Sequence, residues 1–243
     1  MAKKYVKIAL CLLTLLFSTF ASATIIHQTQ GMSDTGDSII FESRLTIDQD
    51  LLTLQLFNFS PLTSNSPDDL LSSYFFDIYN SIGQRPELVL ISARGDVYQT
   101  NKKSADKLQT ASADLKAVKS NDNTWIYKPM NPAYNPYLGF AVGTVGNGNL
   151  NPNGFPGNIV GAIDYSIYTG DIATQSLSNK LLVKDSLTFT FSGLTGFAES
   201  DISNYFMFGM GTKPDTILLN IPEPATLIIL GLGGTVLFVR KRK

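Results

Sequence analysis

Apolar and polar residues alternate in short runs along most of this chain. The clearest runs are SLTFTFSGL at 186–194 and LLTLQLFNF at 51–59, where nearly every second side chain is apolar. A period of two turns one face of a strand toward a core and the other toward water, as in an antiparallel sheet. Eight more short apolar runs, most of them bounded by Gly, Pro, Asn or Asp, are also predicted to be strands. They lie at 38–47, 74–80, 87–98, 124–129, 138–145, 162–169, 205–211 and 215–221.

Ten short strands at uneven spacing, without a fixed-period repeat, predict an all-β fold. We expect one antiparallel β-sandwich domain, jelly-roll-like, over residues 24–221, because about 200 residues are enough for a sizeable core. Two stretches interrupt the pattern. Residues 101–119, NKKSADKLQTASADLKAVK, place apolar side chains at helical spacing and predict either one short surface helix or a mobile insertion. Residues 146–158, GNGNLNPNGFPGN, are rich in Gly, Asn and Pro and predict a loop.

The N-terminal end has the pattern of a signal peptide. Residues 1–23 begin with three lysines, continue with an apolar run and end in Ala21-Ser22-Ala23. We expect cleavage after residue 23, with Ala21 and Ala23 in the signal-peptidase site, since the run is short for a first transmembrane helix. The only cysteine, Cys11, lies in this segment, which excludes disulfides and thiolate metal sites from the mature chain.

The C-terminal end has a second hydrophobic run. Residues 225–239 carry no charge and predict a transmembrane helix, although fifteen residues rise only about 22 Å against roughly 30 Å of bilayer hydrocarbon. We therefore expect the run to be either a sorting signal that is held briefly in the membrane or an ordinary C-terminal anchor. Basic residues after it predict a cytoplasmic C-terminus and an exported body. They are Arg240, Lys241, Arg242 and Lys243.

Charge is unevenly distributed along the chain. The whole sequence has 19 basic and 20 acidic residues, but seven of the bases lie in the two ends. Residues 24–221 therefore carry 12 basic and 19 acidic side chains, a net charge of −7. An acidic body argues against nucleic acid as a partner and against binding anionic lipid surfaces through bulk charge.

The tail resembles a known sorting signal. Pro222-Glu223-Pro224, the hydrophobic run and the basic cluster together are similar to the PEP-CTERM signal of bacterial surface proteins. The resemblance implies that a membrane transpeptidase, an exosortase, recognises Pro222, Glu223 and Pro224, removes the helix, and releases or attaches the body at the cell surface. These residues would be acted on by another enzyme and would not be catalytic.

Parts of the body are similar to a group of exosortase-dependent surface proteins of undefined activity. The similarity spans most of residues 51–210, while residues 102–119 have no counterpart in it. It implies no substrate. The motifs that carry it are DDLLSSYFFDI at 68–78, NGFPGN at 153–158, IDYSIYTGD at 163–171 and DSLTFTFSGL at 185–194.

Residue types for catalysis are scarce. His27 is the only histidine, and we expect it to be disordered or at a strand end. Asp77 and Asp164 lie in apolar strand contexts and are candidates for a buried carboxylate pair, as in glycoside hydrolysis, although strand aspartates more often face solvent. We therefore expect no enzyme and no catalytic residue.

Two further motifs each predict a local feature. Four aspartates near the first strands suit a structural calcium, although solvated turns are favoured because the spacing is not that of an EF-hand. They are Asp34, Asp37, Asp48 and Asp50. Arg94-Gly95-Asp96 predicts a hairpin turn between two strands. We expect no other cofactor or metal.

Four aromatic residues fall within thirteen positions, interleaved with prolines. They are Trp125, Tyr127, Tyr134 and Tyr137. Such rings either stack against sugars or cover one end of the sandwich, because aromatic side chains dominate cores in general.

The patterns together predict a non-enzymatic surface or extracellular-matrix protein of a bacterium. We expect it to be exported and held in the inner membrane as a precursor by the helix at 225–239, and the resemblance of the tail implies that an exosortase then processes it. The alternative is a carbohydrate-binding module of the exopolysaccharide or biofilm matrix, with extracellular polysaccharide as its partner.

Overall fold

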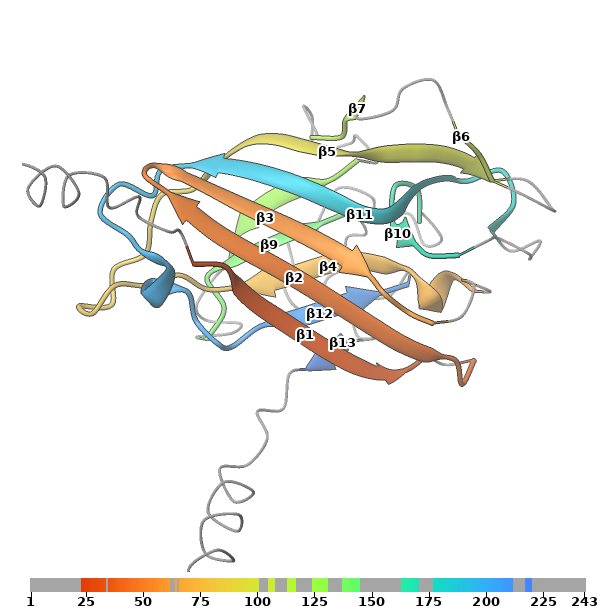
Figure 1. Ribbon diagram of the computed structural model, residues 1–243, viewed down its shortest axis with the longest axis horizontal. Helices are drawn as coiled ribbons and strands as arrows, with labels where there is room; N and C mark the ends of the chain where they lie inside the picture. The colour runs from red at the N-terminus through yellow and green to blue at the C-terminus, as the bar shows by residue number, and fades with distance from the viewer. Residues whose placement is uncertain are drawn as a thin grey trace, which may run out of the picture.

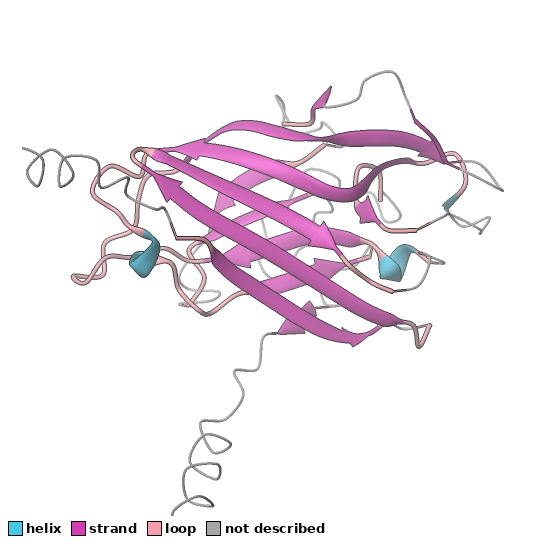
Figure 2. Ribbon diagram, in the orientation of Figure 1, coloured by secondary structure: helices cyan, strands magenta, loops and turns pink. Residues whose placement is uncertain are grey.

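The computed structural model describes residues 23–33, 35–61, 64, 66–100, 105–107, 113–116, 124–130, 137–144, 163–170, 177–211 and 217–219. Within these residues the strands form one continuous mixed sheet that folds into two layers (Figure 1). The helical residues lie in short turns, among them the 3-10 turns Pro67–Asp69 and Glu199–Asp201 (Figure 2). The prediction of an all-β sandwich is confirmed.

The first layer contains the long strands, and neighbouring strands within it run antiparallel. Buried and part-exposed residues alternate along its central strands, because each strand faces the core on one side and water on the other. Two short strands, β6 and β7, pair with the outer edge of β5. In order, the layer consists of β1 (Ile25–Met32), β2 (Ser38–Asp48), β3 (Leu51–Asn58), β11 (Leu181–Ser192) and β5 (Val89–Thr100), with β6 (Ala105–Lys107) and β7 (Ala113–Asp114) beyond.

The second layer is shorter and lies behind the first (Figure 1). Strand β10 (Ile167–Tyr168) joins the two layers, because Ile167 pairs in parallel with Val183 of β11 and antiparallel with Leu71 of β4. In order, the layer consists of β8 (Ile126–Pro129), β9 (Phe140–Gly143), β4 (Leu71–Phe76), β12 (Met207–Met210) and β13 (Ile217–Leu219).

Every residue of β4 is buried, which explains why its sequence does not alternate. Tyr74 and Phe76 face the main core between the layers. Phe75 points to the other side, where it packs with Met130, Leu138 and their neighbours in a smaller cluster. Met130 and Leu138, which lie near the two ends of the β8–β9 connection, thus cover part of the outer face of the second layer.

Two predictions about local structure are wrong. Residues 105–107 and 113–114, expected in a helix or a mobile insertion, are strands, because the edge of β5 offers backbone groups to pair with. The tripeptide at 94–96 is not a turn, since β5 continues through it. Gly95 is needed there for space, because a Cβ would collide with Leu187 and Val183 of β11.

Strand β1, missing from the predicted strands, is held by a buried histidine. His27 is 2% exposed, so the expectation of a disordered or terminal position is wrong. Its ring stacks on Phe206 at 4.2 Å between centroids, and a hydrogen bond of 2.6 Å joins Nδ1 to the Tyr74 hydroxyl of the second layer. The histidine therefore ties the edge of one layer to the other.

The expected signal peptide at 1–23 lies outside the described residues except for Ala23, and the expected transmembrane helix at 225–239 and the loop at 146–158 lie wholly outside them. In the part of the chain that is described, no helix has the length and apolar character needed to cross a bilayer.

We expect His27 to make folding stability depend on pH. Burial lowers its pKa from 6.5 to about 4. Below pH 6.5 the histidine becomes protonated in the unfolded chain, whereas in the folded chain it becomes protonated only near pH 4. Stability is therefore complete above pH 6.5 and falls by up to roughly 3 kcal/mol toward pH 4. Urea unfolding at several pH values measures this.

The control for this prediction is His27→Phe, which keeps a ring against Phe206 but cannot titrate. Carboxylates contribute to the acid response of both proteins alike. The free energy of unfolding of the variant should therefore fall less between pH 6.5 and pH 4 than that of the natural chain. Parallel curves for the two proteins would contradict a buried neutral His27.

Candidate functional site

An open pocket of about 300 Å³ lies where three separate segments meet. The segments follow β4, precede β9 and precede β12. The pocket combines one ion pair, one hydroxyl and three phenol rings. Its polar side chains are Asp77, Arg85 and Ser203, and its rings are Tyr79, Tyr137 and Tyr205.

Backbone hydrogen bonds hold two of these segments side by side. Ile78 and Ile202 form an antiparallel bridge. The Tyr79 N–H donates to the Asp201 carbonyl at 3.0 Å, and the Ser203 N–H donates to the Asp77 carbonyl at 3.0 Å. The end of β4 and the approach to β12 are therefore fixed relative to each other, although they are more than one hundred residues apart in the sequence.

The chain then reverses in a tight turn that returns Arg85 to Asp77. The Asn80 side chain shapes this turn, because its Oδ1 accepts from the N–H groups of Ile82 and Gln84. Gly83 has a φ of +77°, a backbone region open to glycine. The sequence NSIGQ at 80–84 therefore forms a turn, and the turn places the guanidinium group.

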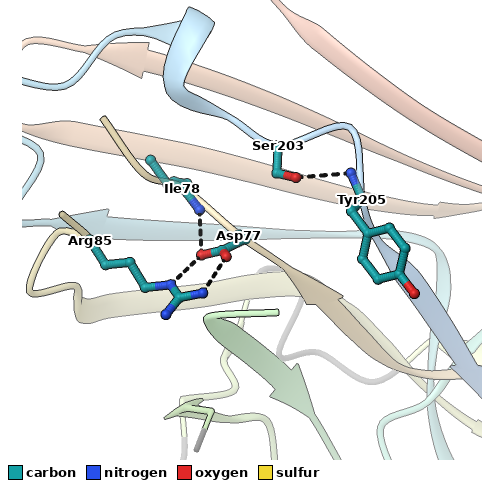
Figure 3. A network of polar contacts seen from close by, with 5 residues as sticks. All are labelled: Asp77, Ile78, Arg85, Ser203 and Tyr205. Carbon is teal, nitrogen blue, oxygen red and sulfur yellow. Dashed lines mark hydrogen bonds and ion pairs between the residues drawn. The ribbon is translucent and has the colours of Figure 1, made fainter. Parts of the chain in front are cut away.

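Asp77 and Arg85 form a two-point ion pair at the base of the pocket (Figure 3). Arg85 Nε and Nη2 donate to the two carboxylate oxygens at 2.8 and 2.7 Å, and the Ile78 N–H donates to Oδ1 at 2.9 Å. The hydrogen bond to Asp77 raises the pKa of Arg85. Gly139 packs directly against the pair, where a Cβ would collide with both side chains. The geometry neutralises a buried carboxylate.

The tyrosines form the exposed wall of the pocket. Tyr137 is 63% exposed and Tyr79 47% exposed, and Tyr205 is 37% exposed. The Tyr137 and Tyr205 rings lie 5.3 Å apart between centroids and are tilted by 51°. The Tyr205 N–H donates to Ser203 Oγ, which orients the start of that segment (Figure 3). The rings present apolar faces with hydroxyl tips, a combination suited to a polar ligand with flat apolar patches.

Of the four aromatics that the sequence groups together, the three that the structure describes lie in different environments. Trp125 is fully buried, donates from Nε1 to the Tyr165 carbonyl and packs edge-on against Phe189 at 5.3 Å. It is a core residue and offers no face to a ligand. Tyr127 packs edge-on against Phe191, and burial raises its pKa. Tyr137 alone of the described three reaches the pocket, while Tyr134 lies outside the described residues.

The described aspartates that the sequence offers as a carboxylate pair or as calcium ligands also do not gather at one site. Asp77 is bound to Arg85, whereas Asp164 Oδ1 accepts from the Leu181 N–H, so each carboxylate has its own partner. Asp37 and Asp50 lie beyond opposite ends of β2, whose eleven residues span about 35 Å, too far for one calcium ion. Among the described residues no group of three or more His, Cys, Asp or Glu side chains is arranged to hold a metal.

The chain is an all-β sandwich with an open pocket of about 300 Å³ at the ends of β4, β9 and β12. Residues 220–243 match the family model of the PEP-CTERM protein-sorting motif, which confirms the resemblance seen in the tail. The motif implies an exported surface protein that an exosortase processes. Comparison with curated proteins and with solved structures gives no match.

We expect Arg85→Ala to destabilise the fold, because it leaves the Asp77 side chain, 1% exposed, without its counter-charge. The expected loss is about 3 kcal/mol, which lowers Tm by roughly 6–12 °C in a domain of this size. Thermal unfolding measures it. Arg94→Ala, on an exposed arginine of β5, is the control and should change stability by less than about 0.5 kcal/mol. Equal effects of the two variants would contradict the role given to the pair.

Proposed function

We propose that this chain is a non-enzymatic surface or extracellular-matrix protein, which its tail delivers to the outside of a bacterial envelope that makes exopolysaccharide. The PEP-CTERM motif at 220–243 is the observation that carries the proposal. The acidic, cysteine-free body between the two ends is the part that remains at the surface after both ends are processed.

The contacts of two titratable groups, His27 and Asp77, support a body without catalysis. His27, the only histidine, is enclosed by Phe206 and Tyr74, and burial keeps it neutral at ordinary pH. The Asp77 carboxylate accepts three hydrogen bonds within the protein. A general acid or base needs access to a proton on its substrate, and these groups serve the fold instead.

Processing by an exosortase predicts a defined change in mass. The protein recovered from its native envelope should end near Pro222–Pro224 and lack the hydrophobic run. In a strain without the exosortase, the protein should retain Lys243. A variant in which three alanines replace Pro222-Glu223-Pro224 should also retain it. Intact-mass spectrometry distinguishes these forms. A C-terminus at Lys243 in both strains would instead indicate an ordinary membrane anchor.

Binding to extracellular polysaccharide is a second candidate function, and the pocket is the observation that favours it. Exposed tyrosines beside a hydrogen-bonding pair offer both kinds of contact that a sugar ring requires. If the chain binds polysaccharide in this pocket, the expected contact residue is Tyr137 instead of Trp125 and Tyr127. The other residues of the site come from distant parts of the sequence.

A matrix role predicts where the processed protein is retained. In a strain that makes exopolysaccharide, the protein should sediment with the matrix. In an isogenic strain unable to make the polymer, most of it should pass into the medium, while its C-terminus remains the same. Quantitative immunoblots of the two fractions measure this. Equal retention in both strains would argue against the polymer as the partner without affecting the sorting function.

A further inference from the structure

We infer that the pocket lined by Tyr79, Tyr137 and Tyr205 binds a short stretch of a neutral pyranose glycan and selects against acidic glycans. The inference rests on the carbohydrate-binding candidate above and specifies its site and ligand class. Four observations carry it: the size of the pocket, its rings, its charge and its rigidity.

The size and openness of the pocket suit part of a polymer. Its volume of about 300 Å³ lies at the lower end of the range for small-molecule sites, roughly 300–1,000 Å³. It is too small for a large cofactor. Because it is open to solvent and bounded by three separate segments, a chain can enter and leave it without an end being enclosed.

The rings supply the apolar half of sugar recognition. Pyranose rings have a face of C–H groups, and an aromatic face buries that surface at low entropic cost because a tyrosine has only two side-chain torsions. Tyr137 and Tyr205 come within 5.3 Å and are tilted, so they form two walls of one corner. A sugar placed in this corner stacks on one ring and contacts the other.

The charge of the pocket favours a neutral ligand. Its charged lining residues are one carboxylate and one guanidinium, already joined by two hydrogen bonds, so they cancel. An anionic sugar would meet no uncompensated cation there and would approach a body with net charge −7. A neutral sugar has no such penalty, and its hydroxyl groups find donors and acceptors in Ser203, Arg85 and the tyrosine hydroxyls.

The supporting structure keeps the corner in place without a ligand. Hydrogen bonds from the Ser203 and Tyr79 N–H groups to the Asp77 and Asp201 carbonyls hold the segment of Tyr205 against the end of β4. Gly139, two residues after Tyr137, packs against the ion pair and allows the Tyr137 segment to approach closely. A preorganised site loses less free energy to ordering when it binds.

An exposed aromatic elsewhere provides a matched control. Phe59 is 44% exposed, close to the value for Tyr205, and its ring stacks on Phe57 at 5.1 Å. The Arg44 guanidinium covers the Phe57 ring at 4.6 Å. Neither phenylalanine lines the pocket, so Phe59→Ala removes an exposed ring without altering the proposed site.

The test uses the processed protein recovered from the cell surface. The probes are immobilised cello-, malto- and mannan oligosaccharides as neutral glycans, and oligogalacturonate and alginate oligosaccharides as acidic ones. We expect at least one neutral series to bind about tenfold more tightly than the acidic ones, with little dependence on salt. Tyr137→Ala and Tyr205→Ala should each weaken that binding about tenfold, and Phe59→Ala less than about twofold. The fluorescence of buried Trp125 checks that each variant is folded.

Each other result overturns a defined part of the inference. Neutral-glycan binding that survives both tyrosine variants would move the site elsewhere and leave the carbohydrate function standing. Preference for the uronates, weakened by salt, would overturn the neutral class. Absence of binding to every probe would overturn the inference. A mass shift that depends on the exosortase would show separately that the sorting function is intact. Tyr137→Phe, which keeps the ring, should retain binding to within about threefold if stacking is the main contribution.

Discussion

Contact between the apolar faces of the two layers is the interaction on which the rest of this protein depends. The only cysteine precedes the body, so an exported domain is held together here without covalent cross-links. Aromatic pairs bridge the layers: Phe41 of β2 lies 5.9 Å from Phe208 of β12, and Tyr127 of β8 lies 5.3 Å from Phe191 of β11. Each such pair contributes about 0.5–1.5 kcal/mol beyond the area it buries. Trp125 belongs to this core, which is why it is unavailable to a ligand.

The pocket is a consequence of how this core ends. Strand β4 is buried along its whole length, and Asp77 is the first residue beyond it. A carboxylate at that depth is costly unless it is paired and hydrogen-bonded. The turn at 80–84 meets this requirement by returning Arg85, and Tyr79, the residue before the turn, is exposed. The residues needed to satisfy a buried charge therefore also build the polar base of the candidate site, which links its stability to its shape.

Strands with a period of two could be predicted from the sequence, and strands without one could not. Residues 51–58 and 186–192 alternate clearly and lie in β3 and β11. In β1 the buried positions are His27 and Thr29, while Ile26 and Met32 are exposed, so the usual pattern is inverted. The Tyr74 hydroxyl and the Phe206 ring, which belong to the other layer, are contacts that make the inward histidine favourable. These two partners of His27 lie 47 and 179 residues away in the sequence, so no local window contains them.

The sequence by itself determined the class of fold and the destination of the protein. Alternation is a local property, and the tail motif is contiguous because an enzyme reads it as a linear segment. The candidate site was decided only by the tertiary structure. Tyr79, Tyr137 and Tyr205 are separated by more than fifty residues at each step and meet because β4, β9 and β12 are neighbours in one sheet. Proximity along the chain grouped Tyr137 with Trp125, whereas packing buried the tryptophan and left the tyrosine exposed. Burial depends on the whole core, so sequence spacing alone did not separate these two rings.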